Sequence, residues 1–108
     1  MGASLLIRRD AFDQVNGFDE RFFLYWEDAD LCRRMRARGQ TVRYVPGARV
    51  VHLGGESSRR AHRFATRAFH RSAYLYYTTH IARSPRSPAR WLAWTALTAR
   101  GWWRGLRR

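Results

Sequence analysis

The chain has 108 residues and a formal net charge of +13, which fits one small domain with a modest core. No apolar run approaches the ~20 residues that a membrane-spanning helix needs. Cys32 is the single cysteine, so an internal disulfide is excluded. A reducing compartment such as the cytoplasm is therefore expected.

The charge is unevenly distributed. Residues 1–56 contain all eight acids and nine arginines, whereas residues 57–108 contain twelve arginines and no acid. The second half is expected either to face an anionic partner or to be widely solvated. The anionic partners that fit are the phosphates of a nucleotide sugar, the headgroups of anionic lipids, and nucleic acid.

The first elements are short. The apolar run at residues 4–7 predicts a buried strand. Asp10 is a suitable cap for a short helix that continues to Val15, and Asn16 and Gly17 are typical of a helix stop. A turn then leads into the aromatic run at residues 22–26.

Three acids follow this aromatic run within four positions: Glu27, Asp28 and Asp30. A helix begins there and is predicted to end at Gly39. One or two of these acids are explained as caps of a positively polarised helix end. Carboxylates crowded beside an aromatic wall should repel, and at least one should have a raised pKa. The cluster therefore indicates either a helix N-terminus with more acids than capping needs, or a functional site. In a functional site the acids would act as a general base or bind hydroxyls or a metal.

Two more strands are predicted at residues 40–45 and 48–53, joined by a turn at Pro46 and Gly47. His52 lies at the end of the second strand, where a neutral imidazole could ligate a metal or serve as an ordinary structural residue. Gly54 and Gly55 follow directly. Glycines let a ligand approach the backbone closely, so both are candidate substrate-binding residues.

The second half has helical periodicity. An apolar and aromatic stripe predicts a long helix that begins after an N-cap at Ser57 or Ser58 and reaches His80. This stripe is expected to pack on the body of the domain. The segment 84–88 contains two prolines and should break the helix.

A last helix is predicted from about Ala89. Four tryptophans fall within residues 91–103, more than a small core needs, and arginines surround them. Tryptophan and arginine together suit the surface of a bilayer, with the rings at headgroup depth. Gly101 and Gly105 should weaken this helix in water. The alternative is that the tryptophan face docks on the body or on another protein.

Several segments together resemble the C-terminal catalytic half of family 2 glycosyltransferases, nearest to the bacterial rhamnosyl- and galactofuranosyltransferase-like group. They also resemble the galactosyltransferase C-terminal domain. The matching segments, in order and with compatible spacing, are residues 2–12, 15–23, 26–34, 44–46 and 51–58. The resemblance implies an α/β fold: the C-terminal portion of a GT-A fold followed by two helices.

The resemblance also implies inverting transfer of a sugar from a nucleotide-sugar donor to a hydroxyl acceptor. Asp28 matches the base, while Glu27 and Asp30 would position the acceptor or shape the loop. Trp26 would form an apolar wall for a sugar. His52 would help to complete the site of a divalent metal, Mg²⁺ or Mn²⁺, in the complete enzyme. One histidine cannot hold such an ion, so this chain alone is expected to bind none.

Residues 1–58 are accordingly expected to be the acceptor side of a catalytic domain, and residues 59–108 a basic, aromatic-rich helical tail. The nucleotide-binding half with its Asp-x-Asp motif is expected to precede residue 2. Without it, the chain should be a poor or inactive enzyme: a fragment, a mis-started gene product or half of a split enzyme.

The expected partners are a nucleotide sugar, a lipid-linked or polysaccharide acceptor of the cell envelope, and an anionic membrane surface. The chain would then be peripheral on the inner face of the plasma membrane. The alternative function is a small basic protein that binds membranes or nucleic acid without catalysis. Nucleic acid is disfavoured because no recognition motif is present and the acid cluster would repel phosphate.

Overall fold

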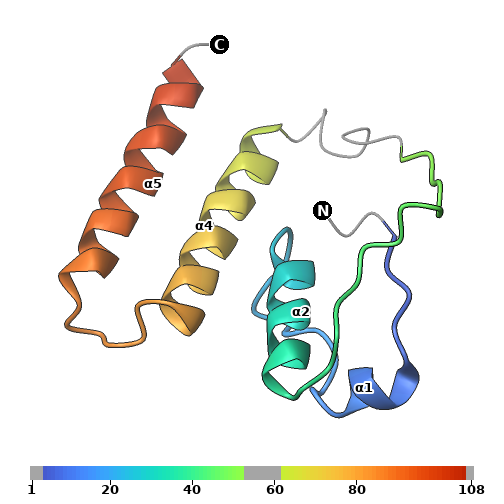
Figure 1. The fold of residues 1–108 in the computed structure, drawn as a ribbon. Coiled ribbons are helices and arrows are strands. Elements are labelled where there is room, and N and C mark those ends of the chain that lie inside the picture. Colours follow the sequence, from blue (N-terminus) through green and yellow to red (C-terminus); the bar gives the residue numbers. More distant parts are fainter. Residues whose placement is uncertain (1–3, 53–61, 107–108) are drawn as a thin grey trace.

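The computed structural model describes residues 4–52 and 62–106, which contain four helices. These are α1 (Arg9–Asp13), α2 (Glu27–Ala37), α4 (His62–His80) and α5 (Pro88–Leu106). Helices α4 and α5 lie side by side as an antiparallel hairpin, and α2 lies on the other side of α4 (Figure 1). The predicted boundary at residues 58 and 59 falls outside the described residues.

The prediction of an α/β fold, as the C-terminal portion of a GT-A fold, is wrong for the described residues. No strand forms at residues 4–7, 40–45 or 48–52, although their composition favours strands. Residues 41–52 are exposed throughout. A strand is stable only when its backbone pairs with a neighbouring strand and one face is covered. The described part of the chain provides no such partner, so these segments run as extended connections (Figure 1).

A small core joins α1 to α2. Leu31 is fully buried, and Met35, one helical turn later, is buried on the same side of α2. Both pack against the inner face of α1 and the residues that follow it. The members of this core are Ala11, Val15, Leu31 and Met35, with Ile7 and Phe12 partly buried against them. This core fixes the direction of α2 and therefore the place of the acids at its beginning.

The ends of α1 and α2 follow the sequence signals closely. Asn16 and Gly17 have positive φ values of 57° and 67° after α1, and Gly39 has a φ of 79° after α2. The predicted stop at Gly39 is therefore confirmed. Helix α1 already ends at Asp13, two residues before the predicted Val15, and Asn16 and Gly17 belong to the turn that follows it. The predicted cap is not confirmed, because Arg8 occupies the N-cap position of α1 and Asp10 lies within the first turn, where it pairs with Arg8.

We expect Gly17→Ala to destabilise the fold more than Gly39→Ala. Both positions need the left-handed backbone, which costs a residue with a Cβ about 1–2 kcal/mol. A Cβ at Gly17 would also lie 3.1 Å from the ring of Phe12, whereas a Cβ at Gly39 would meet nothing within 4 Å. Urea unfolding of the two variants measures the difference, and equal losses would show that the Phe12 contact adds no strain.

The two C-terminal helices form as predicted, and the break at residues 84–88 is confirmed. Pro88 is the first residue of α5, where its missing N–H has no cost. Gly101 lies against α4, since a Cβ there would be 3.5 Å from the ring of His70. This glycine thus allows the two helices to approach closely. The predicted caps Ser57 and Ser58 lie outside the described residues.

The aromatic stripe of α4 packs on the loop before α2, as its spacing predicts. The ring of Phe69 lies 5.8 Å from that of Tyr25 and 5.9 Å from that of Trp26. The buried hydroxyl of Ser72 donates a hydrogen bond of 2.9 Å to the carbonyl of Leu24. These contacts hold the loop of residues 22–26 on the hairpin. Within the described residues, no helix is long and apolar enough to cross a membrane.

Candidate active site

The acid cluster begins at a strained turn. Tyr25 and Trp26 have φ values of 67° and 71°, in the left-handed region that bulky residues rarely adopt. Such a conformation costs about 1–3 kcal/mol per residue and is found mainly at functional sites. Here the packing of both rings on α4 offsets the cost, and the ring of Trp26 also lies 5.1 Å from that of Tyr76. The turn directs the chain into α2.

Glu27 and Asp28 open the first turn of α2, and both are half-buried. The carboxylate of Asp28 accepts a hydrogen bond of 2.8 Å from the amide of Ala29. The Oε2 atom of Glu27 and the Nε1 atom of Trp26 are both buried and have no hydrogen-bond partner within the described chain. Buried polar atoms without partners are costly and need an explanation. Because both atoms are buried, neither is open to a substrate in this structure.

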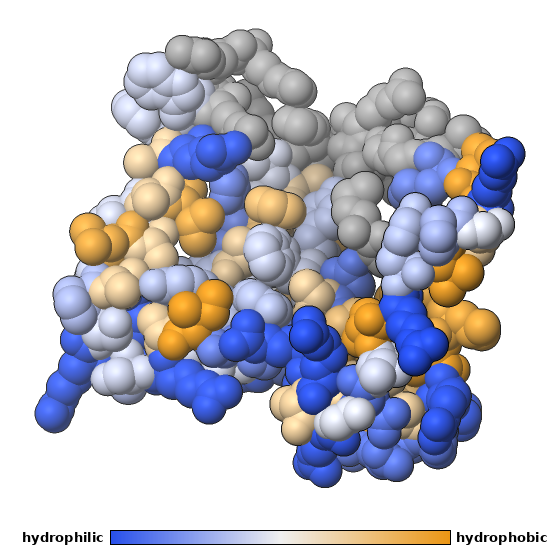
Figure 2. All heavy atoms as spheres, viewed as in Figure 1, coloured by the Kyte–Doolittle hydropathy of each residue, from blue (hydrophilic) through white to orange (hydrophobic). Residues whose placement is uncertain are grey.

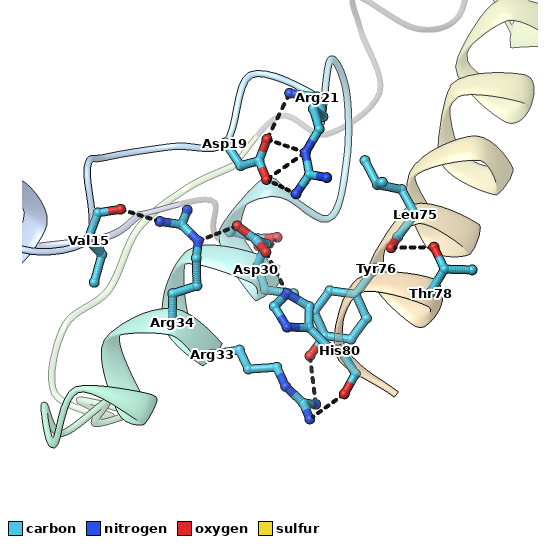
Figure 3. A network of polar contacts seen from close by, with 12 residues as sticks. Val15, Asp19, Arg21, Asp30, Arg33, Arg34, Leu75, Tyr76, Thr78 and His80 are labelled. Carbon is cyan, nitrogen blue, oxygen red and sulfur yellow. Dashed lines mark hydrogen bonds and ion pairs between the residues drawn. The ribbon is translucent and has the colours of Figure 1, made fainter. Parts of the chain in front are cut away.

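Asp30 has a different environment, because its side chain is only 1% exposed. One oxygen accepts a hydrogen bond of 2.7 Å from Nε of Arg34, and the other is 2.6 Å from Nε2 of His80 on α4 (Figure 3). Burial of a carboxylate is costly unless hydrogen bonds and an opposite charge compensate for the lost contact with water. Asp30 therefore joins α2 to the end of α4.

Arg34 extends the same network toward α1. Its guanidinium donates a hydrogen bond of 2.6 Å to the carbonyl of Val15 (Figure 3). It donates a second hydrogen bond of 2.8 Å to the carbonyl of Gly17. Arg34 thus satisfies backbone groups at the end of the α1 region while it pairs with Asp30. Sequence reasoning missed the role of His80, which lies fifty residues from Asp30. The one available signal is that His80 is a titratable group on an otherwise apolar and aromatic stripe.

The loop that leads into the aromatic run at residues 22–26 contains an ion pair between Asp19 and Arg21. The guanidinium of Arg21 donates to both carboxylate oxygens of Asp19, with a shortest distance of 2.6 Å (Figure 3). This hydrogen bonding lowers the pKa of Asp19 below its ordinary value, against the opposing effect of partial desolvation. The carboxylate therefore stays ionised at neutral pH and fixes the path of the loop.

The structure brings four of the predicted site residues together: Trp26, Glu27, Asp28 and Asp30. Trp26 packs its ring on Phe69 and Tyr76, and its role as a wall for a sugar stays a prediction. His52 is exposed. Gly54 and Gly55 lie outside the described residues, so their predicted role in substrate binding stays a prediction as well.

The described residues do not fit a metal site. No group of three or more His, Cys, Asp or Glu side chains that could hold an ion occurs among residues 4–52 and 62–106. Mg²⁺ and Mn²⁺ prefer several oxygen ligands. A metal bound through His52 in the complete enzyme therefore stays a prediction.

We expect calorimetric titration of this chain with Mn²⁺ to give no stoichiometric site. The physical reason is that the described residues supply too few converging oxygen ligands. The His52→Ala variant serves as the matched comparison, and it should give the same featureless titration. A tight site in the original chain that is lost in the variant would contradict this expectation.

A recess of about 400 Å³ lies along α2. It contains two guanidinium groups and no acid; its lining is Ala29, Cys32, Arg33, Arg36, Val42 and Tyr76. Arg33 is oriented by hydrogen bonds of 3.4 Å to the hydroxyl of Tyr76 and 3.2 Å to the carbonyl of His80 (Figure 3). Guanidinium groups in such a place suit the oxygens of a phosphate.

Comparison with known proteins agrees with the resemblance seen in the sequence. Residues 1–106 match the family described as glycosyl transferase family group 2. An N-acetylglucosaminyl-diphospho-decaprenol L-rhamnosyltransferase of Mycobacterium tuberculosis (strain H37Rv) is 42% identical over 90 residues, which cover 83% of this chain and 29% of that protein. No solved structure matches.

Two further relatives match shorter stretches of the chain. Rhamnosyltransferase WbbL of Escherichia coli (strain K12) is 36% identical over 75 residues, covering 69% of this chain and 28% of that protein. O-antigen biosynthesis protein RfbC of Myxococcus xanthus is 37% identical over 57 residues, covering 53% of this chain and 4% of that protein. The chain thus spans less than a third of the curated relatives that it matches. It belongs to glycosyl transferase family group 2 and is rhamnosyltransferase-like.

Proposed function

We propose that this chain is the acceptor side of an inverting sugar transferase of cell-envelope polysaccharide or glycolipid synthesis. The donor would be a nucleotide-activated sugar, and the names of the relatives favour rhamnose. The acceptor would be a hydroxyl on a lipid-linked sugar, because one relative is named for an acceptor on a diphospho-decaprenol carrier. Family membership and the acid cluster at the start of α2 support this proposal.

The observation that carries the proposal is the different surroundings of the three acids. Asp30 is buried and held by Arg34 and His80, so a substrate hydroxyl cannot reach it. Asp28 is half-buried at the beginning of the helix, at the position that matches the base of the family. We therefore assign the role of general base to Asp28. Asp30 instead holds α2 against the end of α4 through its contact with His80.

The proposed step is a displacement at the anomeric carbon. The carboxylate of Asp28 takes the proton of the acceptor hydroxyl while the hydroxyl oxygen forms the new bond to that carbon. The bond from the anomeric carbon to the nucleotide diphosphate breaks, and the electron pair leaves with the diphosphate. The configuration is inverted because the acceptor attacks from the face opposite the leaving group.

One neighbouring feature would bind a substrate. Arg33 and Arg36 line the adjacent recess and would contact phosphate oxygens of a substrate. Both residues lie farther along α2 than Asp28.

The donor side of the reaction would require residues beyond the described ones. We therefore expect the 108-residue chain to have little or no transfer activity by itself and to gain activity when joined to a donor-binding half. Transfer from nucleotide-activated rhamnose to a polyprenyl-diphosphate-linked N-acetylglucosamine, followed by chromatography of the lipid product, tests this. A joined protein that is stably folded, binds both substrates and forms no product would overturn the proposal.

A further inference from the structure

We infer that the outward face of α5 is a binding surface for an anionic lipid bilayer. This inference goes beyond the proposed function, because it concerns a surface that takes no part in the chemistry. The surface consists of eight residues on one side of the helix: Trp91, Leu92, Thr95, Ala96, Thr98, Ala99, Trp102 and Trp103. All eight are exposed, and none carries a charge.

The hairpin turns this face away from the rest of the described chain. Positions 93, 97 and 101 recur at helical spacing, are partly buried, and place Gly101 against His70 of α4. The opposite side of α5 is therefore the outward side. Trp91, Leu92 and Trp102 on it are 68%, 70% and 71% exposed. The body of the protein, including α2, lies beyond α4 (Figure 1), so docking of this face on the described body is excluded.

The threonine hydroxyls of the outward face are already hydrogen-bonded within α5. The hydroxyl of Thr95 donates to the carbonyl of Trp91 at 3.0 Å, and the hydroxyl of Thr98 donates to the carbonyl of Trp94 at 2.8 Å. These internal bonds satisfy the two side-chain donors, so burying them in the interface of a bilayer leaves no unpaired group. Tryptophan rings favour the depth of lipid headgroups.

The charges around the face select an anionic surface. Exposed Arg83 and Arg86 lie in the turn before α5, and exposed Arg100 flanks the outward face. The chain from residue 57 to its end contains no acid that would repel anionic lipid. In Figure 2, apolar and weakly polar side chains lie over α5, on the left, with strongly hydrophilic ones along the lower edge. This is the arrangement of a helix that lies in a membrane surface.

The same hairpin fixes the acid cluster relative to this surface. On its other side, α4 contacts the acid region through the pair of His80 and Asp30 and through the hydrogen bond from Ser72 to the carbonyl of Leu24. The bilayer surface and the acids thus lie on opposite sides of one helix layer.

The test is sedimentation of the 108-residue chain with vesicles of phosphatidylcholine alone or mixed with phosphatidylglycerol, whose anionic headgroups supply a negative surface potential. We expect binding to the anionic vesicles with a blue shift of tryptophan emission. The triple variant Trp91→Ser, Leu92→Ser, Trp102→Ser should bind more than about tenfold more weakly, because it loses most of the apolar contact. Arg100→Gln should weaken binding to anionic vesicles about fivefold and leave neutral vesicles unaffected.

The matched control is the triple variant Leu6→Ser, Tyr44→Ser, Val51→Ser, which removes three apolar side chains that are 104%, 89% and 89% exposed but lie outside α5. It should bind vesicles like the original chain. Circular dichroism checks that every variant keeps its helices. Equal loss in the control, or no binding to any vesicle, would overturn the inference. Self-association or binding of a single-stranded oligonucleotide that is lost in the α5 variant, without vesicle binding, would assign the face to a second copy or to nucleic acid instead.

These outcomes are independent of the proposed function. Vesicle binding requires no donor-binding half and no turnover, and none of the substituted residues belongs to the acid cluster. A failure of the lipid test leaves the role of Asp28 untouched, and a failure of the transfer assay leaves the lipid surface untouched.

Discussion

Asp28→Asn should lower the turnover of the complete transferase by about 10²–10⁴-fold, the usual contribution of a general base. Asparagine keeps the size of the side chain and can still accept the hydrogen bond from the amide of Ala29, now 2.8 Å from Asp28. It cannot take a proton from the acceptor hydroxyl at neutral pH. The decisive measurement is single-turnover transfer at saturating donor, with donor affinity measured separately and expected to be nearly unchanged.

Glu20→Gln is the matched control for that experiment. Glu20 is an exposed acid in the same half of the chain, and its removal changes the net charge by the same amount. Turnover in this variant should stay within about twofold of the original, as expected for a surface substitution. Near-normal turnover in Asp28→Asn, or an equal loss in both variants, would rule out Asp28 as the base.

Asp30→Asn should lower the free energy of unfolding by about 3–5 kcal/mol, because removing one member of a buried ion pair leaves the others uncompensated. Arg34 would keep its hydrogen bonds to the backbone near α1, but it would lose its anionic partner at 2.7 Å. His80 would lose its contact of 2.6 Å to the carboxylate. Urea unfolding followed by far-ultraviolet circular dichroism measures the change.

Asp13→Asn provides the comparison, since Asp13 pairs with Arg9 on the exposed face of α1. An exposed pair at this spacing contributes about 0.3–0.5 kcal/mol, so the loss should be small. A double variant with His80→Gln should lose less than the sum of Asp30→Asn and His80→Gln measured singly, because both remove the same contact. Strict additivity, or a loss from Asp30→Asn as small as that from Asp13→Asn, would contradict the role assigned to the pair.

The helices of this protein were predictable from local sequence. Helix α2 ends where Gly39 adopts a positive φ, and the chain leaves the α1 region through Asn16 and Gly17 in the same way. The prolines at 85 and 88 separate α4 from α5 as predicted. Such signals work because helical hydrogen bonds and helix stops involve residues only a few positions apart.

The strands were not predictable in the same way. Residues 40–45 and 48–52 have the composition of strands, yet they are extended and unpaired within the described chain. A strand depends on a partner that can lie anywhere in the sequence, so composition alone cannot establish it. The predicted α/β fold failed for this reason.

The sequence by itself determined that three acids gather at the beginning of a helix, and that tryptophans and arginines gather in the last one. Only the tertiary structure decided that Asp30 is buried against His80 while Asp28 stays accessible, and that the tryptophan face of α5 points away from the body. The physical reason is that spacing along a helix establishes which residues share a face. Which residues that face contacts depends on the packing of a helix many residues away in the sequence. That packing decides which carboxylate is buried and which aromatic ring stays exposed to solvent.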